Sequence, residues 1–315
     1  MEELHLNPLG PQTASGLVEL FRALYGETYP ESEVYQPEQL LSLHANGARS
    51  TWVAHTSEGR VVGSITISRQ TPYARLYTLG HALVLPDYRG RSLALQLTML
   101  GATEVFQDEE VAGGLTETGC HALKTQELVY KGSFLPCAML PGALSPEALP
   151  VEQRLDQPVS LLVSFIKLQD PPQTAYVPAR AAGLISEVVR ILGVQRELRE
   201  APLGAPEPTS QVTVSQHGDL TRLSVARIGA DLIRLLPREA PRSQVVLPLD
   251  TPAVSFAEEL LYRSGYRPCG LFPRWFGGDG LVYQRVRGPV SFEQDVLYAP
   301  ESQQLAALVR EQWAS

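Results

Sequence analysis

Residues 84–94 read VLPDYRGRSLA, and this stretch constrains the chain more than any other. An apolar strand ends at a proline, a basic loop follows, and a helix-forming run, SLALQLTMLGATEVF, begins at once. Backbone N–H groups and the side chains of Arg89 and Arg91 would then gather at a helix N-terminus, where the helix dipole favours a bound anion. The stretch predicts a phosphate-binding strand–loop–helix unit, with an ordinary exposed basic turn as the alternative.

The usual glycine fingerprints of phosphate-binding folds do not occur in this chain. It has no G-x-G-x-x-G and no G-x-x-x-x-G-K-[ST], so the Rossmann and P-loop interpretations lose their motif support. The stretch instead resembles the pyrophosphate loop of the GNAT acyltransferases, whose core is R/Q-x-x-G-x-G/A. Arg89 takes the first position, Ala94 fills the last, and Ser92 replaces the first glycine. A serine N–H still donates to phosphate and serine is a good helix N-cap, although glycine permits the closest approach.

The resemblance implies an acyl-CoA substrate, most commonly acetyl-CoA, held by the end of the strand, the loop and a later helix start. The implied contacts are Leu83, Val84 and Leu85; then Arg89, Gly90, Arg91, Ser92, Leu93 and Ala94; and finally Thr125 and Gln126. The polar side chains of Thr125 and Gln126 either touch CoA or merely cap their helix. No metal site is expected.

The sequence around the loop predicts a mixed α/β sheet. Residues 51–69 hold two β-rich runs joined by Ser57-Glu58-Gly59-Arg60, which is a hairpin signal, and GNAT domains place a hairpin before the cofactor strand. An amphipathic helix and a second short helix precede the hairpin. After the loop helix come a strand (AGGLTETGCHA), a helix (KTQELVYK) and a further strand after Phe134, in β–α–β order.

Further residues resemble a group of two-domain bacterial GNAT proteins. They are Tyr29-Pro30, Tyr35, Pro37, Glu38 and Leu40; Thr125-Gln126 and Ser133-Phe134; and Gly265-Tyr266, Gly270, Pro273, Gly278-Asp279, Leu281 and Gln284. A length of 315 residues also exceeds one typical domain. The resemblance covers most of the chain, but only the loop motif is specific by itself.

A proline-rich stretch, LPGALSPEALPVEQRLDQP (140–158), reads as a linker and places a domain boundary near residue 155. Residues 1–155 are predicted to form the catalytic, acyl-CoA-binding GNAT domain. Residues 156–315 contain strands, helices and a hairpin turning at His217-Gly218-Asp219, but no basic glycine loop that opens a helix. They are predicted to form a degenerate GNAT-like domain, and an unrelated α/β domain is the alternative.

Composition limits the kinds of binding partner and the cellular location that we expect for this chain. A net charge of −8 argues against nucleic acid as the main partner, and no apolar run reaches membrane-spanning length. The N-terminus is unlike a signal peptide, and the three scattered cysteines suggest reduced thiols in a cytoplasm. We expect a cytoplasmic, bacterial monomer or homodimer.

The catalytic groups are less clearly marked. An acceptor ammonium must lose a proton before it attacks the thioester. His81 lies on the cofactor strand, and alternation places it on one face with Tyr77, Leu79 and Leu83. If that face is the acceptor cleft, His81 is the natural base. Otherwise it is a hydrogen-bonded strand histidine.

Two further candidates follow His81. Glu117 and His121 lie two steps of alternation apart on the next predicted strand, as a catalytic pair or a surface-exposed strand end. Many family members carry a tyrosine acid where this chain has Val129, and Tyr130 is its neighbour. One residue is about 100° on a helix, so Tyr130 is a candidate acid that we expect to face elsewhere.

Aromatic and acidic residues elsewhere have open roles. Tyr29 and Tyr35 sit where GNAT domains cover the acceptor. Asp279 lies in a Gly-Gly-Asp-Gly turn signature, while Trp275 and Phe276 line an acceptor site, an interface or the core.

The predicted function is an acyl-CoA-dependent N-acyltransferase acting on a small primary amine or an exposed amine of a larger molecule. The alternatives are a CoA-binding sensor or pseudoenzyme without turnover, and a structural protein that binds no cofactor.

Overall fold

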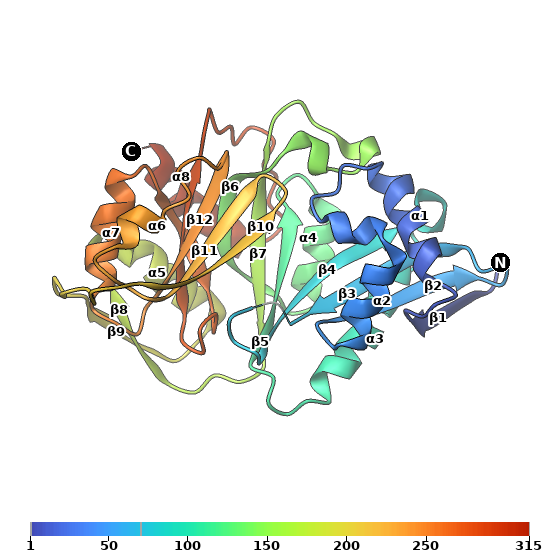
Figure 1. Cartoon of the computed structure of the whole chain (residues 1–315), viewed down its shortest axis with the longest axis horizontal. Helices are drawn as coiled ribbons and strands as arrows, with labels where there is room; N and C mark the ends of the chain where they lie inside the picture. The colour runs from blue at the N-terminus through green and yellow to red at the C-terminus, as the bar shows by residue number, and fades with distance from the viewer. Residues whose placement is uncertain (1, 70, 315) are drawn as a thin grey trace. The chain divides into compact units, whose positions relative to one another are not determined.

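The computed structural model describes residues 2–69 and 71–314 and shows a mixed α/β protein, as predicted (Figure 1). Its contacts divide the chain into two compact units. Unit 1 comprises Met1–Thr116 and Ser145–Asp156, and unit 2 comprises Glu117–Leu144 and Gln157–Ser315. The sequence predicted a single cut near residue 155, whereas the structure groups residues 117–144 with the second half of the chain. The reason is strand pairing, because a strand of this segment pairs with two strands that come after it.

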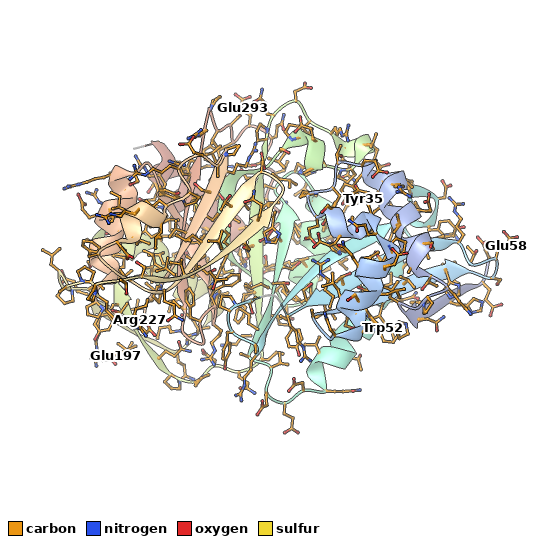
Figure 2. All side chains as sticks on the ribbon, viewed as in Figure 1. Tyr35, Trp52, Glu58, Glu197, Arg227 and Glu293 are labelled. Carbon is orange, nitrogen blue, oxygen red and sulfur yellow. The ribbon has the colours of Figure 1, made fainter. Side chains whose placement is uncertain are left out.

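Unit 1 is built on a sheet whose strands follow the chain order. Strands β1 (Leu4–Pro8), β2 (Arg49–Thr56), β3 (Val61–Ser68) and β4 (Leu76–Val84) pair antiparallel, and the first residues of β5 (Gly113–Gly119) pair parallel to β4. The hairpin predicted at Ser57-Glu58-Gly59-Arg60 is confirmed. Glu58 is exposed at its tip and points away from the protein (Figure 2).

Helices cover this sheet because each presents an apolar stripe. Helix α1 (Ala14–Tyr25) buries Leu17, Phe21 and Leu24, which recur at helical spacing. Helix α2 (Pro37–Ala45) begins at a proline and lies next to α1 over β2–β4 (Figure 1). Helix α3 (Leu93–Phe106) follows the basic loop and packs on β3, where Gly101 leaves room for the side chain of Ile67.

Unit 2 contains a sheet in the order β7–β6–β13–β14–β12–β11–β10 and a separate parallel pair, β8–β9. Its strands are β6 (Leu135–Leu144), β7 (Val159–Lys167), β8 (Gln173–Val177), β9 (Arg196–Glu200), β10 (Gln211–His217), β11 (Leu220–Arg227), β12 (Arg242–Pro248), β13 (Arg267–Phe272) and β14 (Gly280–Val286). Its helices are α4 (Leu123–Lys131), α5 (Ala182–Leu192), α6 (Leu232–Leu235), α7 (Val254–Arg263) and α8 (Pro300–Ala314). The predicted hairpin between β10 and β11 is confirmed, whereas β8, β9, β13 and α8 were not predicted. In the described part of the chain no helix is both long and apolar enough to cross a membrane.

The linker predicted over 140–158 is wrong in its first part. Strand β6 continues to Leu144, and the apolar residues from Leu140 to Ala143 are buried. Pro141 fits there because the register between β6 and β7 shifts between Leu140 and Leu144, and a bulge tolerates a residue without an N–H. The remaining residues, 145–156, form two short 3-10 turns that belong to unit 1.

Candidate functional site

Strand β4 extends beyond the ladder that it forms with β5. The parallel pairing joins Leu76–Leu79 to Gly113–Thr116 and ends there, while β4 continues to Val84. Gly80 and Ala82, on this continuation, are exposed. A strand edge of this kind offers main-chain hydrogen bonds to an extended ligand.

A β-bulge interrupts this continuation at His81. The register between β3 and β4 shifts between Ser64 and Thr66, and His81 has a left-handed backbone with φ of 51°. The Ser64 hydroxyl donates to the His81 carbonyl at 3.0 Å and holds the bulge. Bulges re-aim side chains, so the ordinary alternation of the strand ends here.

The predicted face of His81 is therefore wrong. Tyr77 and Leu79 pack with Val105 of α3, as the alternation requires. The His81 ring instead lies edge-on to Phe21 of α1, with 5.2 Å between the ring centroids. The inserted residue of the bulge shifts the parity of the strand and turns His81 toward α1.

Phe21, Tyr29 and Glu31 lie against the His81 ring, and Arg49 pairs with Glu31; we call these five residues the His81 cluster. The ring centroids of Tyr29 and His81 lie 5.4 Å apart. The backbone N–H of Tyr29 donates to the Tyr35 hydroxyl at 2.9 Å. Glu31 Oε2 lies 3.5 Å from His81 Nε2 and 2.7 Å from Arg49 Nη2. The structure thus joins two predicted residues, His81 and Tyr29, to two that the sequence analysis missed.

Glu31 and Arg49 have no local motif that marks them. Glu31 follows the Tyr29-Pro30 pair in a proline-broken turn, and Arg49 opens β2. The one signal in the sequence is an arginine at the start of a strand that becomes buried, which requires a carboxylate partner. Which carboxylate that is depends on the tertiary fold.

The basic loop forms an open helix N-terminus. Arg89, Gly90, Arg91 and Ser92 are all exposed, and Gly90 and Ser92 have φ of 76° and 57°. The first N–H groups of α3 have no acceptor within the helix. Turns of this kind direct successive N–H groups toward a common point and bind anions. Ser92 stands at the N-cap but makes no side-chain capping bond, and its left-handed backbone favours glycine.

The two loop arginines make exchangeable contacts. Arg89 Nε donates to the Val84 carbonyl at 3.1 Å, and its Nη1 forms an ion pair with Glu152 of the 145–156 segment. Arg91 Nη2 donates to the Asp87 carbonyl at 3.2 Å. Because both guanidinium groups are exposed, an anion at the loop can reach them, but at Arg89 it competes with the carboxylate of Glu152.

The apolar residues predicted to contact the cofactor turn their side chains inward. Leu83, Leu85 and Leu93 are buried, so only their backbone groups are candidates for ligand contacts. The N–H of Leu85 donates to the Val62 carbonyl at 2.9 Å. Leu85 therefore has no donor left for a ligand, which corrects its predicted role, whereas Leu83 and Val84 lie on the extended edge of β4.

Glu117 and His121 do not form the predicted pair along one strand. Strand β5 ends at Gly119, and His121 lies in the turn that follows, with its ring against Gly119. The carboxylate of Glu117 instead pairs with Arg222 of β11, with 3.1 Å between Oε1 and Nη2. Both residues belong to unit 2.

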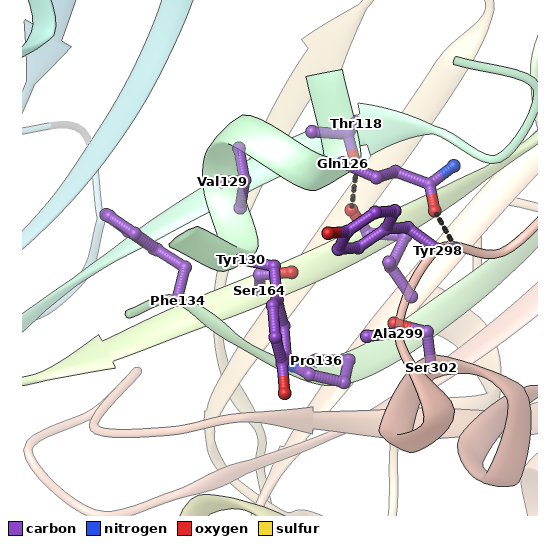
Figure 3. A pocket seen from close by; sticks show the side chains of 11 residues that line it. Thr118, Gln126, Val129, Tyr130, Phe134, Pro136, Ser164, Tyr298, Ala299 and Ser302 are labelled. Atoms are coloured by element: carbon purple, nitrogen blue, oxygen red, sulfur yellow. Dashed lines mark hydrogen bonds between the residues drawn. The ribbon is translucent and has the colours of Figure 1, made fainter. Parts of the chain in front are cut away.

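Tyr130 lies beside a small pocket in unit 2 (Figure 3). Its hydroxyl lies 3.2 Å from Glu301 Oε2, and its ring is 6.0 Å from that of Tyr298. The negative charge of Glu301 raises the pKa of Tyr130, because it opposes formation of the phenolate. The hydroxyl therefore stays protonated at neutral pH, as a proton donor requires.

Gln126 also belongs to this part of unit 2, where it has a structural role. Its amide nitrogen donates to the carbonyls of Gly119 and Val296, and its amide oxygen accepts from the N–H of Tyr298. It is buried and fastens the segment before α8 to α4, so it is not available to CoA. Thr125 is exposed beside it.

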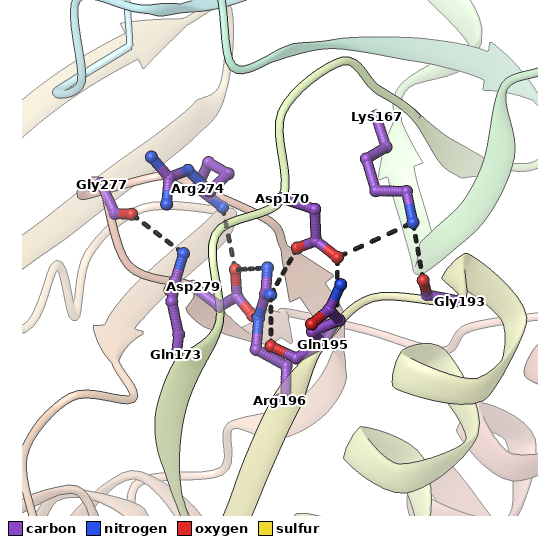
Figure 4. Close-up of polar contacts among 9 residues, drawn as sticks. All are labelled: Lys167, Asp170, Gln173, Gly193, Gln195, Arg196, Arg274, Gly277 and Asp279. Carbon is purple, nitrogen blue, oxygen red and sulfur yellow. Dashed lines mark hydrogen bonds and ion pairs between the residues drawn. The ribbon is translucent and has the colours of Figure 1, made fainter.

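Asp279 is more than a turn residue (Figure 4). Its two carboxylate oxygens accept hydrogen bonds from Arg196 Nε at 2.6 Å and from Arg196 Nη2 at 3.2 Å. The third nitrogen of the same guanidinium, Nη1, pairs with Asp170 at 2.6 Å. The side chains of Arg196 and Asp279 are almost wholly buried. Nearby, Trp275 is also buried and donates to the Ser224 hydroxyl, which places it in the core.

Fold and loop together define unit 1 as a mixed α/β domain in which an extended strand edge leads into a basic loop at an open helix N-terminus. Residues 15–115 match the model of the Acetyltransferase (GNAT) family, and this part of the chain belongs to that family. No curated protein matches the chain.

Three solved structures to which part of this chain is similar are described as acetyltransferases. One is a ribosomal-protein-S5-alanine acetyltransferase from Vibrio fischeri, with 12% identity, 54% of this chain and 96% of that chain covered, and a TM-score of 0.44. A spermidine N-acetyltransferase from Vibrio cholerae, in complex with CoA and spermine, has 14% identity, coverage of 52% and 95%, and a TM-score of 0.42. A ribosomal-protein-alanine N-acetyltransferase from Brucella melitensis has 17% identity, coverage of 52% and 99%, and a TM-score of 0.42. The family assignment rests on the family model.

Proposed function

We propose that this protein is an N-acyltransferase that moves an acyl group, in the commonest case acetyl, from acyl-CoA to a primary amine. One observation carries the proposal. Strand β4 continues beyond its pairing with β5, and this continuation leads directly into the basic loop and the open N-terminus of α3. The extended edge suits a chain of amide groups such as pantetheine. The loop suits a diphosphate.

The residues of the loop fit an anionic group. Arg89 and Arg91 are exposed on either side of Gly90, and the first N–H groups of α3 have no helical acceptors. A charge-assisted hydrogen bond to phosphate contributes about 1.5–3 kcal/mol. The net charge of −8 does not oppose this, because the two arginines form a local basic cluster.

Tyr25 of α1 connects the loop with the His81 cluster. Burial raises the pKa of Tyr25 to about 12, with a further rise from Tyr35, and the positive charge of Arg89 acts against it. Arg89 is thus close enough to influence Tyr25, whose ring lies 4.8 Å from that of Tyr29. The loop and the His81 cluster are neighbours within unit 1.

In this proposal His81 is the base. Bound acyl-CoA would supply an activated thioester: its acyl carbon forms the new bond to the amine nitrogen as its bond to sulfur breaks, and the departing thiolate takes the second proton of that nitrogen. The His81 ring takes one proton from the acceptor ammonium, which frees the lone pair of the amine. Loop and strand edge hold the thioester in place, so positioning supplies much of the rate enhancement.

A binding protein without turnover is the second candidate. Ser92 has a left-handed backbone at a position where the family motif has glycine, and Arg89 already forms an ion pair with Glu152. Tyr130 and Glu117 lie in unit 2 and have partners there. These features support a CoA sensor, and release of free CoA from acetyl-CoA in the presence of amines distinguishes the two functions.

The first experiment is calorimetric titration of acetyl-CoA into the wild type and an Arg89→Ala/Arg91→Ala variant. Losing two charge-assisted contacts of about 1.5–3 kcal/mol each should weaken binding at least about a hundredfold. The matched control is Arg69→Ala/Arg75→Ala, which removes the same charge from exposed positions of unit 1 and should bind like the wild type. No binding by the wild type would rule out both the transferase and the sensor.

A further inference from the structure

The carboxylate of Glu31 faces the His81 ring. We propose that Glu31 is a positioning residue for His81: it fixes the hydrogen of the neutral ring on Nε2 and stabilises the imidazolium that forms when the ring takes a proton. This inference rests on the proposed function, because it assigns a role within the same transfer site.

One carboxylate oxygen serves two partners. Glu31 Oε2 lies 3.5 Å from His81 Nε2 and accepts a hydrogen bond from Arg49 Nη2 at 2.7 Å. The same Arg49 nitrogen lies 3.1 Å from Glu33 Oε1. The side chain of Arg49 is only 4% exposed, so its charge holds Glu31 in place from within the protein. The 3.5 Å separation is longer than a good hydrogen bond, and such contacts often tighten when substrate binds.

The surroundings of the ring strengthen this interaction. The His81 side chain is only 8% exposed, between the rings of Phe21 and Tyr29. A charge pair acts more strongly where water is excluded. The other titratable groups of the surrounding elements are Tyr25, Tyr29, Tyr35, Glu33 and Arg49. The high pKa of Tyr25 keeps its hydroxyl neutral, so Glu31 is the carboxylate that faces the ring.

The backbone of His81 is held in an unfavourable conformation to achieve this orientation. Its φ of 51° lies in the left-handed region, which is unfavourable for a residue other than glycine. The hydrogen bond from Ser64 to the His81 carbonyl maintains it. Strained residues of this kind persist where a site needs a particular side-chain direction.

The chemistry follows from the ring's two nitrogens. A lone pair on Nε2 would face the carboxylate oxygen and be repelled, so the neutral ring carries its hydrogen on Nε2 and accepts at Nδ1. One proton moves from the acceptor ammonium to Nδ1, and the positive charge of the imidazolium then lies beside Glu31. After the transfer the ring returns this proton to solvent, so it is unchanged at the end of each cycle.

The test compares Glu31→Ala with Glu33→Ala, because each variant leaves Arg49 with one carboxylate and only the first removes the partner of His81. Long-range proton–nitrogen spectra of the full-length protein, assigned with His81→Asn, report which ring nitrogen carries the hydrogen. The hydrogen should reside on Nε2 in the wild type and in Glu33→Ala and should distribute over both nitrogens in Glu31→Ala.

Kinetics with acetyl-CoA and an accepted amine give the second measurement. Glu31→Ala should lower kcat about tenfold to a hundredfold, less than the roughly 10²–10⁴ that a whole general base contributes because His81 itself remains, and leave the KM for acetyl-CoA unchanged. Glu33→Ala should keep the wild-type kcat and KM.

Four outcomes would overturn the inference. An unchanged tautomer in Glu31→Ala removes the positioning role, whatever the activity. Equal losses in both variants that track their melting temperatures would make the carboxylates supports for Arg49. A wild type that fixes the tautomer but turns over no amine refutes the proposed function and with it the catalytic role of Glu31, whereas turnover with an unfixed tautomer refutes the role of Glu31 only.

Discussion

Arg89 of unit 1 and Arg196 of unit 2 stand in opposite surroundings. Arg89 in unit 1 is exposed, with Glu152 as an equally exposed ion-pair partner. Arg196 in unit 2 is buried between Asp170 and Asp279, which use all three of its nitrogens. An exposed arginine exchanges its partner for a ligand at little cost, while a buried and saturated one cannot. The comparison separates a binding group from a structural one without reference to family.

The largest effect is expected from a substitution beside the buried arginine, Arg196. Asp279→Ala leaves Arg196 buried with one of its two carboxylates missing, and losing one partner of a buried pair costs about 3–5 kcal/mol. Chemical denaturation should show this loss of unfolding free energy. Arg89→Ala, which removes an exposed pair, should change it by less than about 1 kcal/mol. Similar losses in the two variants would contradict the distinction.

A smaller effect concerns the competitor at the loop. Glu152→Gln removes the carboxylate that pairs with Arg89, and an exposed ion pair contributes about 0–1 kcal/mol. Acetyl-CoA should therefore bind up to about fivefold more tightly in calorimetry. Glu147→Gln, an equally charged change in the same segment, serves as the control. Weaker binding in Glu152→Gln would show that the carboxylate orders Arg89 rather than competes for it.

The smallest effect concerns Ser92. Its φ of 57° costs about 1–2 kcal/mol, and glycine relieves this strain but loses about 0.5–1 kcal/mol through its greater freedom in the unfolded chain. Ser92→Gly should raise the unfolding free energy by about 0.5 kcal/mol. The same change at Ser57, in the β2–β3 turn and without a positive φ, should be neutral or destabilising. A destabilised Ser92→Gly would mean that the hydroxyl makes a contact of its own.

Local sequence was enough to predict the loop and the elements around it. The strand that ends at a proline, the basic turn and the helical run are consecutive and lie within about 25 residues of one another. Each of the two hairpins is equally local in the sequence. Their geometry depends on the backbone preferences of neighbouring residues.

The face of the strand on which His81 lies was not predictable. A β-bulge reverses the alternation of side chains along a strand, and no residue type in the sequence marks where a bulge occurs. Alternation assigned His81 to the side of Tyr77, and the inserted residue turned it toward Phe21. Glu117 was similar: its partner, Arg222, lies 105 residues away in the chain.

The sequence by itself determined the mixed α/β class, the basic loop and the kind of ligand that this loop suits. These depend on short-range periodicity and on turn chemistry, which the chain carries in consecutive residues. The tertiary structure decided which carboxylate faces His81, which arginine is saturated and which candidates lie together in unit 1. Such pairings depend on how distant strands align, and the free energy that aligns them is distributed over the whole core.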